Sequence, residues 1–192
     1  GINPFNQPDV EAAKIKTREL TAAFEKTGSL PAETPVMSSK EADLYTDDSN
    51  AELLKKAGAD GDLTSWLKAH FRRVTPGDYV ALLGYIARDK VTIDALQAMR
   101  LEVREKRQVA TCAEFGPRFL HSTGQAYKGG PDSGVFLQIT ADDAKDLAVP
   151  GQKASFGVIK AAQARCDFDW LTGPRRRALR VHLKGGLKKG LA

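Results

Sequence analysis

Residues 112–140 read Cys112-Ala-Glu-Phe-Gly-Pro-Arg-Phe-Leu-His-Ser-Thr-Gly-Gln-Ala-Tyr-Lys-Gly-Gly-Pro-Asp-Ser-Gly-Val-Phe-Leu-Gln-Ile-Thr140, and this stretch decides the fold. The apolar run that it continues ends at Gly116-Pro117. Because a proline in the first turn of a helix costs no hydrogen bond, we predict a helix from there to Gly129-Gly130-Pro131. Residues 135–139 then form a run typical of a strand. A strand, a helix and a strand in this order predict parallel neighbours with a right-handed crossover, in the middle of an α/β sheet.

The chain from residue 78 onward shows the same alternation. We predict strands at 79–86, 108–115, 135–140 and 178–183, and further helices at 92–106 and 155–165. Near-continuous apolar strands between amphipathic helices indicate a parallel sheet covered on both faces. The predicted fold class is a three-layer α/β/α module with a mostly parallel sheet of four or five strands, preceded by an N-terminal helical segment. Such sheets bind ligands beyond the carboxyl ends of their strands, here the loops after Ile86, Phe115 and Thr140.

Composition sets broad limits on the function. The 192 residues, 42% of them apolar, suit one α/β domain with an appendage. No apolar run approaches the roughly 20 residues that span a bilayer, and no signal peptide is recognisable. Two distant cysteines, Cys112 and Cys166, suit reduced thiols, so we expect a cytoplasmic protein. The net charge of +5 is modest; it favours phosphorylated metabolites and does not require nucleic acid. Because Gly1 opens the sequence inside a motif-like segment, we expect a fragment or a processed chain.

The N-terminal segment reads as a loop that enters a helix at Pro8 and ends at Gly28. On a helical wheel Lys14 lies between Val10 and Thr21, on the side predicted to be buried. An ammonium there either snorkels to solvent, finds a partner or meets a ligand, and the wheel leaves these alternatives open.

Residues 29–73 are predicted to be a linker with short helices, between a motif loop and helix at 1–28 and the module at 74–192. A capping box at Ser49-Asn-Ala-Glu52 predicts one helix, and Asp62 as an N-cap predicts the next. His70 falls on the apolar stripe of that second helix. With no second His or Cys at metal spacing, we interpret it as a packed residue.

The opening Phe5-Asn-Gln7-Pro-Asp-Val-Glu11-Ala-Ala-Lys14 resembles the C-terminal signature of glucose-6-phosphate isomerase, Phe-Asp-Gln-x-Gly-Val-Glu-x-x-Lys. Gln7 and Lys14 keep the spacing of the family's glutamine and lysine, which both reach the active site. The match departs at Asn6, where the pattern has Asp, and at Asp9, where it has Gly.

Residues 115–131 and 134–140 resemble the C-terminal extension of the bifunctional transaldolase/glucose-6-phosphate isomerase proteins. The piece Leu120-His-Ser-Thr-Gly-Gln125 is also similar to a helix of the sugar-isomerase (SIS) domain of the isomerase itself. The resemblance implies a SIS-like, flavodoxin-like extra module that is partly a duplication. It gives no support to residues 28–60.

The resemblance implies interconversion of glucose 6-phosphate and fructose 6-phosphate, an aldose-ketose isomerisation through a cis-enediol. This reaction belongs to glycolysis and gluconeogenesis, and a linked transaldolase would belong to the pentose phosphate pathway. By analogy Lys14 would assist ring opening and Gln7 would hydrogen-bond the substrate. The family's glutamate base, catalytic histidine and phosphate loops have no counterpart here and are expected in an upstream isomerase domain, so the segment alone is expected to be inactive. No cofactor, metal, nucleic acid or membrane is implied, and a homo-oligomer is left open.

Four residues of the central stretch are weaker candidates from their positions alone. Glu114 ends a predicted strand, and His121, Ser122 and Thr123 lie near the start of the next helix, where anions are attracted. A packing role is the more common outcome for such residues, and it leads to the alternative of a noncatalytic SIS-like module that binds a sugar phosphate or serves in assembly. The basic run at 175–177 we interpret as a solvated or domain-facing surface, with nucleic-acid binding as a weaker hypothesis.

Overall fold

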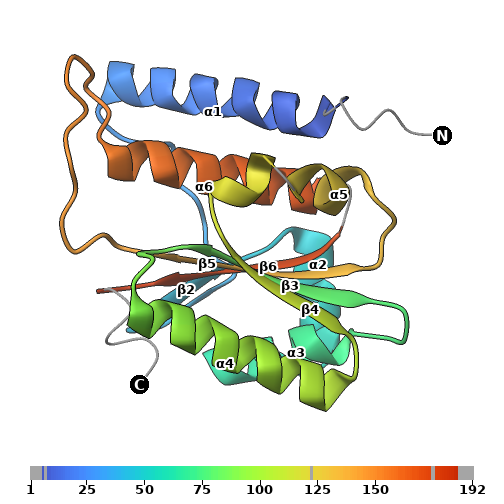
Figure 1. Ribbon diagram of the computed structural model, residues 1–192. Coiled ribbons are helices and arrows are strands. Elements are labelled where there is room, and N and C mark those ends of the chain that lie inside the picture. The colour runs from blue at the N-terminus through green and yellow to red at the C-terminus, as the bar shows by residue number, and fades with distance from the viewer. Residues whose placement is uncertain (1–5, 7, 122, 174–175, 186–192) are drawn as a thin grey trace.

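The computed structural model describes residues 6, 8–121, 123–173 and 176–185, and it is a three-layer α/β/α fold (Figure 1). The elements in chain order are α1 (Pro8–Thr27), β1 (Met37–Ser38), β2 (Ala42–Tyr45), α2 (Asp48–Lys56), α3 (Leu63–Arg72), β3 (Tyr79–Tyr85), α4 (Lys90–Arg107), β4 (Ala110–Phe115), the 3₁₀ helix η1 (Arg118–His121), α5 (Gly124–Gly129), β5 (Gly134–Ala141), α6 (Phe156–Thr172) and β6 (Arg177–Leu183).

The sheet has six strands in the order β1-β2-β6-β5-β3-β4. The four strands of the predicted module are parallel, and β3 lies between β4 and β5 with Leu83 opposite both Glu114 and Gln138. The strands β1 and β2 add an antiparallel edge beside β6. The predicted fold class is thus confirmed, with six strands where four or five were expected.

Two apolar cores cover the two faces of the sheet. One core joins the sheet to α2, α3 and α4 through residues such as Leu54, Trp66 and Leu96. The other core lies beneath η1, α5 and α6, where Phe119 and Phe168 pack on the strands. In Figure 1, α1 forms an additional layer over α6 and α5, on the side of the sheet away from α4.

The helix starts are set by short polar side chains. Asp62 caps α3 as predicted, with its carboxylate accepting from Ser65 N at 2.6 Å. The cap of α2 is Asp47, which accepts from Asn50 N at 3.0 Å, so the predicted capping box at residues 49–52 is wrong by about half a turn. An aspartate at the first extended position takes this role because its carboxylate also suits the positive end of the helix.

Two sequence-based expectations for irregular or helical segments need correction. The predicted linker contributes β1 and β2, since Ala42 and Leu44 alternate inward and are fully buried. The helix predicted after Pro117 is two pieces, η1 and α5. Two residues of low helix propensity explain the break, because Thr123 lies between these pieces and Gly124 begins the second.

The histidines outside the central stretch are His70, which is a packed residue as expected, and His182. His70 is fully buried, its Nε2 lies 3.0 Å from Phe136 O, and burial lowers its pKa to about 3, so it is neutral at pH 7. His182 is held between Thr140 Oγ1 at 2.9 Å and Asp142 Oδ1 at 3.2 Å.

Of the basic run at 175–177, Arg176 and Arg177 are held by partners within the chain rather than solvated as expected, and residue 175 lies outside the described residues. Arg176 is buried, and its guanidinium donates to the carbonyls of Lys128 at 2.6 Å and Gly130 at 2.7 Å. Arg177 binds the Asp78 carboxylate through both terminal nitrogens, at 2.6 and 2.8 Å. Within the described residues, no helix is both long and apolar enough to cross a bilayer.

Candidate functional site

The segment that carries the lysine motif packs against the central stretch of the module. Helix α1 lies on α6 and α5, with Val10 and Ala13 buried beneath it. At its first turn Asp9 N donates to Gln125 Oε1 at 3.2 Å, and Gln125 Nε2 donates to Asp9 Oδ2 at 2.5 Å. This reciprocal pair joins two segments that are 116 residues apart in the chain.

A cavity of about 220 Å³ opens between these segments. Its lining combines apolar, hydroxyl and cationic side chains from α1 with residues from η1 and α6, namely Val10, Ala13, Lys14, Thr17, Arg18, Leu120 and Gln163. Two cations beside an amide and a hydroxyl form a surface that can bind an anionic, hydroxyl-rich molecule.

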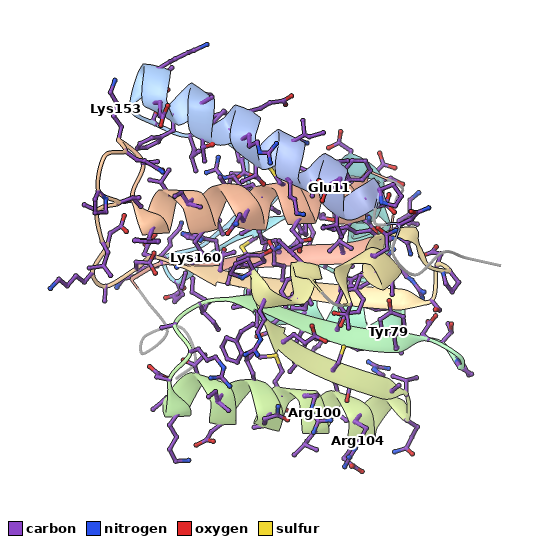
Figure 2. All side chains as sticks on the ribbon, turned by 45° about the horizontal axis from the view of Figure 1, so that its top comes forward. Glu11, Tyr79, Arg100, Arg104, Lys153 and Lys160 are labelled. Carbon is purple, nitrogen blue, oxygen red and sulfur yellow. The ribbon has the colours of Figure 1, made fainter. Side chains whose placement is uncertain are left out.

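Lys14 reaches the cavity from its rim. Its side chain is 42% exposed, and its ammonium lies 2.5 Å from Glu11 Oε1, one turn earlier on the same helix. The hydrogen bond from Lys14 lowers the pKa of the Glu11 carboxyl. Lys14 thus lies on the predicted face of the helix, four residues after the buried Val10. Of the alternatives that the wheel left open, the structure shows snorkelling to solvent with a local partner, Glu11. Figure 2 shows Glu11 on the α1 helix, above α6.

A second cluster lies at the carboxyl end of β4. The Glu114 carboxylate accepts from Tyr127 Oη at 2.9 Å and from Thr123 Oγ1 at 2.8 Å. Cys112 Sγ lies 3.2 Å from the same Tyr127 hydroxyl. Burial raises the pKa of both the Cys112 thiol and the Tyr127 phenol, so both are protonated at pH 7. Each of the two Glu114 carboxylate oxygens therefore accepts one hydrogen bond from a hydroxyl group and keeps one lone pair free for another donor.

Glu114 also lines a cleft of about 460 Å³. The cleft lies at the carboxyl edge of β3 and β4 and includes two exposed arginines, Arg88 and Arg118. The Arg88 guanidinium carbon lies 5.8 Å from the centre of the Phe115 ring. Of the three loops predicted to bind ligands, those after Ile86 and Phe115 line this cleft together with Glu114 of β4, whereas Thr140 lines a different cavity.

The predicted site residues fall into separate places. Lys14 lines the cavity under α1, whereas Glu114 and Thr123 are hydrogen-bonded to each other at the other cleft. His121 ends η1, but its side chain lies outside the described residues, as do Gln7 and Ser122.

Sequence reasoning missed the partners of Glu114 and a buried ion pair. Tyr127 follows Thr123 by four residues, so the two share a helix face, and this spacing was the available signal. No comparable signal marks Lys128 and Asp167, whose side chains are 1% and 2% exposed and whose charged atoms lie 2.7 Å apart. Among the described residues, no group of three or more His, Cys, Asp or Glu side chains could hold a metal ion.

No protein-family model matches the sequence, and no curated protein matches it. One solved structure with a similar course of the chain is a hypothetical protein, TT0462, from Thermus thermophilus. It is 15% identical with a TM-score of 0.49, over 71% of this chain and 39% of that one, so this chain spans about two fifths of that protein's length. A likeness at this level carries no information on activity.

Proposed function

We propose that this chain is the C-terminal part of a glucose-6-phosphate isomerase, from a fusion with transaldolase, and that it supplies Lys14 and Gln7 to a site completed by upstream sequence. The observation that supports the proposal most is the cavity under α1. The motif helix and the Leu120–Gln125 piece, the two segments with the family resemblance, lie side by side and are joined through Asp9 and Gln125.

The chemistry of the cavity rim suits the proposed role of Lys14. In ring opening a donor must give a proton or a hydrogen bond to the ring oxygen or its hydroxyl. The Lys14 ammonium is accessible, and Glu11 orients it from one turn away. Arg18 adds a second cation to the same rim, which would favour a phosphorylated substrate. The base that moves the proton between C1 and C2 is assigned to the upstream isomerase domain.

The test is the coupled assay of fructose 6-phosphate conversion to glucose 6-phosphate. It is run on this chain and on a chain extended with its upstream sequence, each with Lys14→Ala and with Lys26→Ala. Lys26 is the matched control because it is an exposed lysine in the last turn of the same helix. We expect activity only in the extended chain, lowered roughly 10²–10⁴-fold by Lys14→Ala, as for a lost proton donor, and unchanged by Lys26→Ala. Full activity of the short chain, or an active Lys14→Ala variant, would overturn the proposal.

A second candidate function is a noncatalytic module that binds a sugar phosphate at the cleft beside Glu114. The placement of Arg88 and Arg118 at the carboxyl ends of parallel strands favours it. Titration calorimetry with glucose 6-phosphate would then show binding that Arg118→Gln weakens and Lys14→Ala leaves unchanged. Equal binding by both variants would reject this cleft as the binding site.

A further inference from the structure

A third cavity, of about 110 Å³, lies between α6 and the sheet at the carboxyl ends of β5 and β6. One wall comes from the strap, which we define as residues 28–36 between α1 and β1. The charged, titratable and aromatic side chains that line the cavity are Glu33, Tyr45, Tyr85, Lys160, Arg165, Arg180 and His182. It shares no lining residue with the cavity that holds Lys14.

Arg180 forms the floor of this cavity and is held rigidly. Its side chain is 4% exposed, and its guanidinium carbon lies 4.2 Å from the centre of the Tyr45 ring and 5.1 Å from that of Phe168. A guanidinium sandwiched between two rings keeps one orientation, so little entropy is lost when an anion binds it. Arg180 Nη2 donates to Glu33 Oε1 at 2.6 Å.

The second oxygen of the Glu33 carboxylate interacts with another arginine, Arg165. Arg165 Nε lies 2.6 Å from Glu33 Oε2, and Arg165 Nη1 donates to Pro31 O at 2.5 Å. Glu33 is therefore clamped between two guanidiniums from different elements, one on α6 and one on β6. Two guanidiniums that converge on one carboxylate form an arrangement that also suits a phosphate.

The remaining charges of the cavity are mostly positive. Lys160 lines the cavity and pairs with Asp143 outside it. Figure 2 shows Lys160 at the first part of α6, toward the sheet. Among the described residues, Glu33 is the only acid in the lining. A phosphate dianion in place of the Glu33 carboxylate would bring two negative charges, not one, to the three cations Lys160, Arg165 and Arg180, so its attraction to them would be stronger.

Glu33 belongs to a segment outside the helices and strands. Residues 30–35 of the strap have no regular secondary structure, and the sheet begins after them at β1. Exchange of the Glu33 carboxylate for another anion would therefore disturb no strand pairing. The clamp has the geometry of an anion site whose occupant is part of the chain itself.

We infer that this cavity is a binding site for a phosphate group, which replaces the Glu33 carboxylate between Arg165 and Arg180. The phosphate comes either free in solution or on a phosphorylated sugar whose remainder lies toward the opening of the cavity. The site is separate from the proposed isomerase site, so either can fail while the other stands.

The test titrates inorganic phosphate and, separately, glucose 6-phosphate into the full chain, with calorimetry and thermal unfolding as readouts. Glu33→Gln removes the internal competitor, and we expect it to bind phosphate at least about tenfold more tightly than the parent chain, with a larger rise in Tm. Arg165→Gln in the Glu33→Gln background should abolish that gain. Arg104→Gln is the matched control that leaves it unchanged, because Arg104 is an arginine of α4 whose side chain is 49% exposed.

The outcomes of these titrations distinguish the possible ligands and test whether the site exists. Tighter binding of glucose 6-phosphate than of phosphate identifies a sugar phosphate as the ligand, and equal binding identifies free phosphate. Absence of binding by the folded Glu33→Gln variant overturns the inference, as does a gain that survives Arg165→Gln. Should Glu33→Gln fail to fold, phosphorus NMR of the parent chain takes its place: line broadening that Arg165→Lys reduces supports the site, and none overturns it.

Discussion

The buried ion pair between α5 and α6 gives the sharpest test of what stabilises this fold. Lys128 Nζ lies 2.7 Å from Asp167 Oδ1, with both side chains almost completely buried. Neither Lys128 Nζ nor Asp167 Oδ2 makes a hydrogen bond within normal angular limits. Burial raises the pKa of Asp167 although the ammonium lies beside it. The desolvation of the carboxylate therefore outweighs its attraction to Lys128.

From this geometry we predict opposite results for single and double substitutions. Lys128→Met or Asp167→Leu alone leaves one uncompensated buried charge and should lower the free energy of unfolding by about 3–5 kcal/mol at pH 7. For a chain of this length that is a fall in Tm of roughly 6–20 °C. The double variant removes both charges and should unfold with a free energy equal to that of the parent chain or up to about 4 kcal/mol higher.

The assay is urea unfolding followed by far-ultraviolet circular dichroism, with the dependence on urea checked for a constant slope. Lys106→Met is the matched control, because Lys106 pairs with Glu102 at 2.6 Å but the two side chains are 70% and 62% exposed. Its cost should stay below about 1 kcal/mol. A double variant as unstable as the single ones would refute the reasoning, since the pair would then contribute more by attraction than it costs in desolvation.

Two further predictions concern the sheet. The hydrogen bond from Arg177 lowers the pKa of Asp78 to about 2, so this carboxylate stabilises the fold above about pH 4 and loses that effect as the pH falls toward 2. Asp78→Asn should therefore cost on the order of 2 kcal/mol at pH 7 and much less near pH 2, measured by urea unfolding at both. Gly116→Ala would place a Cβ 2.6 Å from the Tyr85 ring and should cost about 1–3 kcal/mol, whereas Gly61→Ala, with nothing within 4 Å, should stay within about 0.5 kcal/mol; equal Tm values for the two alanine variants would contradict this.

The parallel part of the sheet could be predicted because its strands are buried on both faces. Val80 to Tyr85 and Gly134 to Ile139 are buried residue after residue, and such runs between helical patterns have few other interpretations. The edge strand β2 shows why the rest was harder. Only Ala42 and Leu44 are fully buried, and its pairing partner β6 lies about 140 residues later. A pattern of two apolar residues does not distinguish a strand from a loop.

The buried charged side chains could not be predicted either, because their partners are also distant in the sequence. Arg176 looks like part of a solvated basic run until Lys128, Gly130 and Pro131 bring three carbonyl oxygens to its guanidinium. The site residues differ in this respect. Glu114 could be placed at the carboxyl end of its strand from the sequence alone. Its hydrogen bonds could not, because their donors are Thr123, which lies between η1 and α5, and Tyr127, which lies in α5.

The attachment of α1 links the proposed isomerase site to the module beneath it. Helix α1 has only two buried residues among its described positions, and a helix this polar has little stability of its own in water. Polar contacts fix it along its length: Asp9 to α5, Lys16 to Asp169 of α6 at 2.6 Å, and the Glu25 carbonyl to Lys153 at 3.2 Å. Figure 2 places Lys153 beside the far end of α1. The module therefore determines where Lys14 points, so in the proposed enzyme it would act on catalysis by positioning the motif helix, without any of its own residues having to touch the substrate.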